Sequence, residues 1–125
     1  MATVEHVALK ARDLERTKAF YQLLGGQVSR QPGGTRLSVS FASGSRLLFD
    51  QTDALFEVGA LSYMGIELDN FPEVDALLER LKSTVSIGRD LRDEFREATG
   101  PYGFFVSDPD GYPVKVFRYH TAQPD

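Results

Sequence analysis

The residues of this 125-residue chain that could do chemistry are few, and none of them is a cysteine. Without thiols the chain has no disulfide, no thiol nucleophile and no thiolate metal ligand. His6 and His120 are the only imidazoles, so any metal site must depend heavily on carboxylates. Lys115 is a further candidate, because it follows a tight-turn signal in the stretch DPDGYPVKVF. The alternation of Val114 and Val116 predicts a strand in which Lys115 stands on the face opposite the valines.

Composition and charge narrow the class of protein. With 42% hydrophobic residues the chain can form one compact domain over residues 1–125, and it is too short for two of ordinary size. A net charge of −4 argues against nucleic acid or an anionic membrane as a partner. No apolar run has the length of a membrane span, and the N-terminus lacks the layout of a signal peptide. We therefore expect a cytoplasmic protein.

An internal repeat organises the elements that position these residues. The segment HVALKARDLERTKAFYQLL from His6 aligns with YMGIELDNFPEVDALLERL from Tyr63 at an offset of 57. Each segment begins with strand-like alternation and continues with apolar residues at helical spacing. Asp13 and Asn70 are placed as helix N-caps, and Gly25 is placed to end the first helix.

The repeat continues into the strands that follow. RLSVSFASGSRLLF aligns with GFFVSDPDGYPVKVF at an offset of 67, with Gly44 over Gly111. Each module is thus a strand, a helix and three strands, and the fold class is α+β with two βαβββ modules. We place module one at about 3–50, a linker at about 51–59 and module two at about 60–119. The ten additional residues of module two fall in the charged region 83–103, which we expect to be a surface loop or short helix.

The sheet faces turned away from the helices mix aromatic and charged side chains. By strand parity they carry His6, Ala8, Lys10, Arg36, Ser38, Ser40, Arg46, Leu48, Asp50, Tyr63, Gly65, Glu67, Phe105, Ser107, Pro113, Lys115 and Phe117. Such a mixture is typical of a concave ligand cavity. A dimer interface that buries the aromatic rings is the alternative, and the two interpretations are compatible.

The opening HVALKARDLERTKAFYQLLGG and the closing GPYGFFVSDPDGYPVKVF resemble the vicinal oxygen chelate superfamily. This superfamily includes glyoxalase I, extradiol dioxygenases, fosfomycin-resistance enzymes and bleomycin-resistance proteins. The resemblance covers about residues 5–118, and it implies paired βαβββ modules whose curved mixed sheets surround a cavity.

The resemblance also implies where a metal would be bound. The superfamily's ligand positions fall on His6, Leu48, Tyr63 and Lys115, and related proteins commonly have histidine at the third position and glutamate at the fourth. A protonated ammonium has no lone pair and repels a divalent cation. Leucine has no donor atom, and neutral tyrosine is a poor ligand. We therefore expect no metal and no cofactor, although His6 with Asp50 or Glu67 could form a two-ligand remnant.

The function that the resemblance favours is that of the bleomycin-resistance type, a homodimer that sequesters a bulky or anionic aromatic ligand. Lys115 and Arg46 would pair with an anionic group, while Tyr63, Phe105 and Phe117 would stack on a flat ring. The full set of expected ligand-binding residues is His6, Arg46, Leu48, Asp50, Tyr63, Glu67, Phe105, Lys115 and Phe117.

Two other functions remain open. The chain could be a metal-independent lyase or isomerase that uses His6, Tyr63 and Lys115, or an interaction domain that only dimerises. We assign no catalytic residue, because a lone histidine without a partner base is weak support for catalysis. The Lys115 charge needs a counter-charge, which Glu67, Asp50 or an anionic ligand could supply.

Overall fold

The structure, a computed structural model, describes residues 1–120, and for His120 it describes only the backbone. The chain divides into two compact units, Met1–Glu57 and a second unit that begins at Val58. The assignment of residues 1–125 to a single domain stays a prediction. The terminal stretch YHTAQPD predicts a frayed end from Tyr119 onward, but Tyr119 and His120 belong to the last strand. The remainder of this stretch lies outside the described residues.

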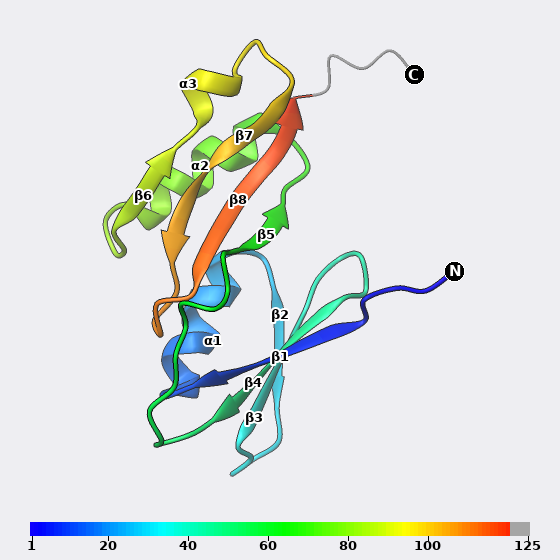
Figure 1. Ribbon diagram of the computed structural model, residues 1–125, viewed down its shortest axis with the longest axis vertical. Helices are drawn as coiled ribbons and strands as arrows, with labels where there is room; N and C mark the ends of the chain where they lie inside the picture. The colour runs from blue at the N-terminus through cyan, green and yellow to red at the C-terminus, as the bar shows by residue number, and fades with distance from the viewer. Residues whose placement is uncertain (121–125) are drawn as a thin grey trace. The chain divides into compact units, whose positions relative to one another are not determined.

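The first unit is a four-stranded mixed sheet with one helix (Figure 1). Its elements are β1 (His6–Ala11), α1 (Leu14–Leu23), β2 (Gln27–Arg30), β3 (Arg36–Ser40) and β4 (Arg46–Gln51). The strand order is β1-β4-β3-β2. β1 runs parallel to β4, and the other neighbouring strands are antiparallel.

The second unit repeats this topology with one additional helix. Its elements are β5 (Met64–Glu67), α2 (Phe71–Leu81), β6 (Ile87–Asp90), α3 (Arg92–Phe95), β7 (Gly100–Ser107) and β8 (Pro113–His120). The strand order β5-β8-β7-β6 matches that of the first unit, and α2 lies behind β7 and β8 in the view of Figure 1. The predicted α+β fold of two βαβββ modules is therefore confirmed.

Helices α1 and α2 begin where the sequence predicts, and α1 also ends where it predicts. The Asp13 carboxylate accepts hydrogen bonds from the backbone N–H groups of Glu15 and Arg16, and the Asn70 side chain accepts one from Glu73. Each cap satisfies backbone donors that have no partner within the helix. After α1 the chain turns at Gly25, whose φ of 90° is in the left-handed region that favours glycine.

The core of each unit lies between its sheet and its helix, as the alternation predicts. In the first unit it includes the buried side chains Leu14, Phe20, Tyr21, Leu37, Val39 and Phe49, and in the second Val74, Leu77, Leu81, Phe104, Val114 and Val116. Val7 is an exception, because the alternation places it with the core and 43% of it is exposed. It lies on β1, which pairs only with β4 within its unit and so leaves one edge open.

The charged region 83–103 is more ordered than a surface loop. It contains β6, the single-turn helix α3 and the start of β7. The expected short helix is present, and β6 is the strand that the repeat requires after the second helix, although the charge pattern did not locate it within this region. Leu91 is buried, and its N–H donates to the Gly103 carbonyl. Within residues 1–120, no helix is long and apolar enough to cross a membrane.

Candidate functional site

The face of the second sheet that carries Lys115 is centred on β8. Cross-strand pairing puts Gly65, Lys115 and Phe105 in one row, and Glu67, Phe117 and Gly103 in the row that follows. Val114 and Val116 are fully buried on the opposite face. The strand and the orientation of Lys115 predicted from the sequence are thus confirmed.

The Lys115 ammonium lies on aromatic rings. Its Nζ is 4.6 Å from the centre of the Tyr63 ring and 5.1 Å from that of Phe117. It also donates to the Tyr63 hydroxyl at 3.4 Å. Tyr63 in turn meets Phe105 edge to face, with ring centres 5.4 Å apart. A cation within about 6 Å of a ring centre is attracted by the negative face of the ring, so Lys115 has cation–π partners here.

The two carboxylates expected to neutralise Lys115 have other partners. Glu67 pairs with Arg118 at 3.5 Å. Asp50, in the first unit, accepts two hydrogen bonds from Arg36 at 2.6 and 3.0 Å, and this pairing lowers the pKa of Asp50 below its usual range. Both candidate counter-charges for Lys115 thus have an arginine as ion-pair partner within their own unit. A guanidinium also matches a carboxylate better than an ammonium does.

The corresponding face of the first sheet carries the remaining expected site residues. The pairing of β1, β4 and β3 puts His6, Arg46 and Ser40 in one row, and Lys10, Asp50 and Arg36 in the last. The row between them holds Ala8, Leu48 and Ser38, of which Leu48 is buried. Leu48 therefore gives this face an apolar centre between two charged rows.

Glu5, which the sequence reasoning missed, organises the charged row that contains His6. Its carboxylate accepts hydrogen bonds from Arg46 Nε at 2.8 Å and Nη2 at 2.9 Å, and it contacts His6 Nδ1. Arg46, and to a lesser extent His6, lower the pKa of Glu5 to about 2. Glu5 precedes the predicted strand, so alternation gave no signal for it. Opposite charges on strands that must pair in parallel could have identified it.

The donor set at the four superfamily positions does not fit a metal ion. In the first unit these positions are His6, whose Nδ1 contacts Glu5, and Leu48, which has no donor. In the second unit they are Tyr63 and Lys115, and the Lys115 ammonium contacts the rings of Tyr63 and Phe117. Over residues 1–120 there is no group of three or more His, Asp or Glu that could hold a metal ion.

Sheets of this topology, with candidate residues on the face away from the helices, define a glyoxalase-like protein. The chain belongs to the Glyoxalase/Bleomycin resistance protein/Dioxygenase superfamily, whose family model matches residues 3–116. No curated protein matches its sequence.

Solved structures with this fold share little sequence with the chain. A possible glyoxalase from Bacillus cereus superposes with a TM-score of 0.75 at 18% identity, covering 94% of this chain and 99% of the other. A glyoxalase/dioxygenase from Nostoc punctiforme superposes with a TM-score of 0.76 at 16% identity, covering 95% of this chain and 92% of the other. A fosfomycin resistance protein from Listeria monocytogenes superposes with a TM-score of 0.73 at 20% identity, covering 94% of this chain and 91% of the other. At these identities the structures establish the fold alone.

Proposed function

We propose that this chain is a metal-free small-molecule binding protein of the glyoxalase/bleomycin-resistance type, which sequesters an anionic aromatic ligand. One observation carries the proposal. Lys115, at a position where related proteins commonly have an acidic metal ligand, lies on the rings of Tyr63 and Phe117. An ammonium in that place opposes metal binding and attracts an anion.

Lys115 is the residue to which we assign the ligand's negative charge. Within the second unit its contacts are the two rings and the Tyr63 hydroxyl. Arg46, the other expected anion-binding residue, has two of its N–H groups on Glu5, so we give it a secondary role. Tyr63 is 46% exposed, which leaves part of its ring available to a flat ligand.

The other expected residues fit supporting roles on the two faces. Phe105 meets the Tyr63 ring edge to face, and Phe117 lies under the Lys115 ammonium. In the first unit His6 and Leu48 provide a polar edge and an apolar centre, and Asp50 is neutralised by Arg36. We propose all nine expected residues as ligand-binding residues.

Binding of 2-naphthoate, followed by isothermal titration, tests the role of Lys115. Its neutral analogue 2-naphthamide keeps the flat ring and lacks the charge. Hydrogen bonds to charged groups contribute about 1.5–3 kcal/mol, so Lys115→Met should weaken naphthoate binding by about 10- to 100-fold and leave naphthamide binding almost unchanged. Lys82→Met, which removes a lysine paired with Glu79 on α2, is the matched control. Equal naphthoate affinities for the two variants would contradict the proposal.

The metal-free state has its own test. Elemental analysis of the purified protein should show well below one equivalent of zinc, nickel, iron or manganese per chain. A stoichiometric metal that survives dialysis would overturn this part of the proposal and return the chain to the superfamily's metal-dependent chemistry.

We further propose that the protein acts as a cytoplasmic homodimer. β1 and β5 are each at an edge of their own sheet, and open strand edges favour association. Light scattering at micromolar concentration should give about twice the chain's mass of 13.9 kDa. A mass near 13.9 kDa would contradict the dimer.

The His6–Glu5 contact favours a second candidate function, a metal-independent lyase or isomerase. A carboxylate on Nδ1 orients the ring and favours the tautomer in which Nε2 can accept a proton. Such a base would exchange the α-proton of a small 2-oxo acid with deuterium from solvent. NMR should then show exchange with the native protein and not with His6→Gln; equal rates would reject this candidate.

A further inference from the structure

A groove on the helix side of the first unit is separate from both sheet faces described above. Six residues line it, and we call it the α1 groove: Glu15, Lys18, Val28, Ser29, Arg30 and Leu37. A short turn joins α1 to β2, and the groove lies away from that turn, between the first half of α1 and the end of β2. Its volume is about 340 Å³, which is within the range of small-molecule pockets.

The second unit contains a chemical counterpart of this groove. Asp75 on α2 corresponds to Lys18 at the helix offset of 57, since 75 minus 18 is 57. Asp90 pairs with Phe104 as Arg30 pairs with Leu37, and Phe104 and Leu37 are equivalent at the strand offset of 67. The two cationic positions that flank the α1 groove are therefore aspartates in the second unit.

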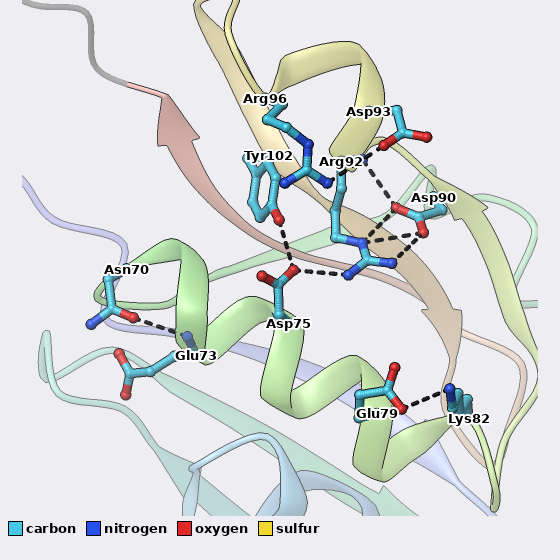
Figure 2. Close-up of polar contacts among 10 residues, drawn as sticks. All are labelled: Asn70, Glu73, Asp75, Glu79, Lys82, Asp90, Arg92, Asp93, Arg96 and Tyr102. Carbon is cyan, nitrogen blue, oxygen red and sulfur yellow. Dashed lines mark hydrogen bonds and ion pairs between the residues drawn. The ribbon is translucent and has the colours of Figure 1, made fainter.

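In the second unit a guanidinium is bound between those two aspartates. Arg92 donates from Nη1 to Asp75 at 2.8 Å, and from Nη2 to Asp90 at 2.9 Å (Figure 2). Tyr102 donates to the same Asp75 oxygen at 2.7 Å. The Arg92 side chain is only 23% exposed, so a charged group is accommodated here between the helix and the end of the strand.

The difference between the units lies in one connection. Residues 91–99 join β6 to β7 and carry α3 with Arg92, whereas β2 and β3 are joined by residues 31–35 alone. The first unit thus has no equivalent of Arg92 within its own chain segment. With Lys18 and Arg30 in place of the aspartates, the complementary group for the first unit is an anion.

We propose that the α1 groove binds a small organic carboxylate, with its charged group between Lys18 and Arg30. Val28, which is half-buried, would contact the apolar part of the ligand, whereas Leu37 also lines the groove but is fully buried. Arg30 donates from Nε to the Gly34 carbonyl at 2.9 Å and from Nη1 to Glu15 at 3.1 Å, which leaves its Nη2 for the carboxylate. This inference does not depend on the ligand proposed for the Lys115 face.

Glu15 gives the proposal a distinctive consequence. Its carboxylate is 70% exposed and is bound to the same guanidinium that would bind the ligand, so it competes with the ligand. Glu15→Gln should therefore strengthen carboxylate binding several-fold. Lys18→Met and Arg30→Met should each weaken it about tenfold or more.

The test is a titration of the isotopically labelled protein with hexanoate, hexanamide and inorganic phosphate, followed by NMR. Hexanoate should shift the amide signals of the first half of α1 and of β2, and hexanamide and phosphate should bind more weakly. Lys82→Met, in the second unit, should bind like the native protein. The proposal is overturned if hexanamide or phosphate binds as well as hexanoate, or if Lys18→Met and Lys82→Met have equal affinities. Shifts confined to residues around Lys115 would also overturn it.

A charge-reversed variant tests the analogy between the units. Lys18→Asp together with Arg30→Asp recreates the arrangement of Asp75 and Asp90, and it should bind methylguanidinium in place of hexanoate. Circular dichroism establishes whether the variant is folded. If it is folded and still prefers hexanoate, the analogy is wrong; if it is unfolded, the single methionine variants decide.

Discussion

Arg92 provides the most direct test of how the charged region 83–103 is held in place. Its guanidinium joins α3 to Asp75 on α2 and to Asp90 at the end of β6 (Figure 2). Replacement by methionine keeps most of the side-chain length and removes all of these hydrogen bonds. Asp75 keeps the Tyr102 hydroxyl as a partner, and both aspartates stay partly exposed, at 44% and 42%.

The exposed fractions set the size of the expected effect. A fully exposed ion pair contributes about 0.2–1 kcal/mol, and a buried hydrogen bond to a charged group about 1.5–3 kcal/mol. The Arg92 side chain is 23% exposed, and its partners Asp75 and Asp90 are more exposed. We therefore expect Arg92→Met to lower the free energy of unfolding by about 2 kcal/mol. For a chain of this length the midpoint of thermal unfolding should fall by about 6–8 °C.

The effect of Arg92 should depend on pH. Arg92 lowers the pKa of Asp90 below its usual range, so the folded state binds this proton less readily than the unfolded state. The resulting stability is present above the unfolded pKa of aspartate, about 3.9, and is lost as the pH falls through the lower folded value. The difference between native protein and Arg92→Met should therefore be larger at pH 7 than at pH 3.

Urea unfolding at both pH values measures this difference. Arg89→Met is the control, since Arg89 is in the same region and its ion pair with Glu94 is 70% and 52% exposed. Arg89→Met should lower the free energy of unfolding by less than about 0.5 kcal/mol. Equal losses for Arg89→Met and Arg92→Met, or a loss for Arg92→Met that does not change with pH, would refute the reasoning.

Two further predictions concern the sheets. Gly103→Ala should lower the free energy of unfolding by about 3 kcal/mol, because the new Cβ would lie 2.0 Å from the Val116 carbonyl oxygen. The control is Gly59→Ala, whose new Cβ meets open space. Urea unfolding should show little change in stability for this control. The Glu5 carboxyl, followed by NMR, should titrate near pH 2 in the native protein and at a clearly higher pH, toward its ordinary value of 4.5, in Arg46→Met, where His6 still lowers its pKa. A Glu5 titration that is unaffected by Arg46→Met would contradict the ion pair.

The sequence predicted the fold because the repeat constrains two modules at once. A strand, a capped helix and a hairpin recur in order, so an error in one module would have conflicted with the other. Asp13 and Asn70 have the same capping role at the offset of 57, and Gly25 ends α1 where a left-handed residue is needed. The repeat required a strand after α2, but the sequence did not locate β6, because a bulge between Ile87 and Asp90 interrupts its pairing with β7 and hence its alternation.

The partners of the site residues were harder to predict than their faces. Alternation placed Lys115, Phe105 and Phe117 on one face, as the register shows. Alternation could not predict which cation each carboxylate pairs with. Glu67 pairs with Arg118 and Asp50 with Arg36, and this choice depends on the length and conformation of the side chains. Glu5 was missed for a related reason, since it comes before β1 and its ion pair needs the parallel neighbour β4.

The repeat also shows how one frame can serve different chemistry in its two halves. Equivalent positions carry opposite charges, with Lys18 against Asp75 and Arg30 against Asp90. The second half satisfies its aspartates with Arg92 from its own insertion, and it therefore needs no ligand to be stable. The first half has the short connection and the cations, and there Glu15 and the Gly34 carbonyl are the partners of Arg30, which leaves part of this positive charge for water or a bound molecule. Grafting residues 91–99 into the first half would on this reasoning place Arg92 beside two cations, which should destabilise that unit, whereas the graft combined with Lys18→Asp and Arg30→Asp should restore its stability.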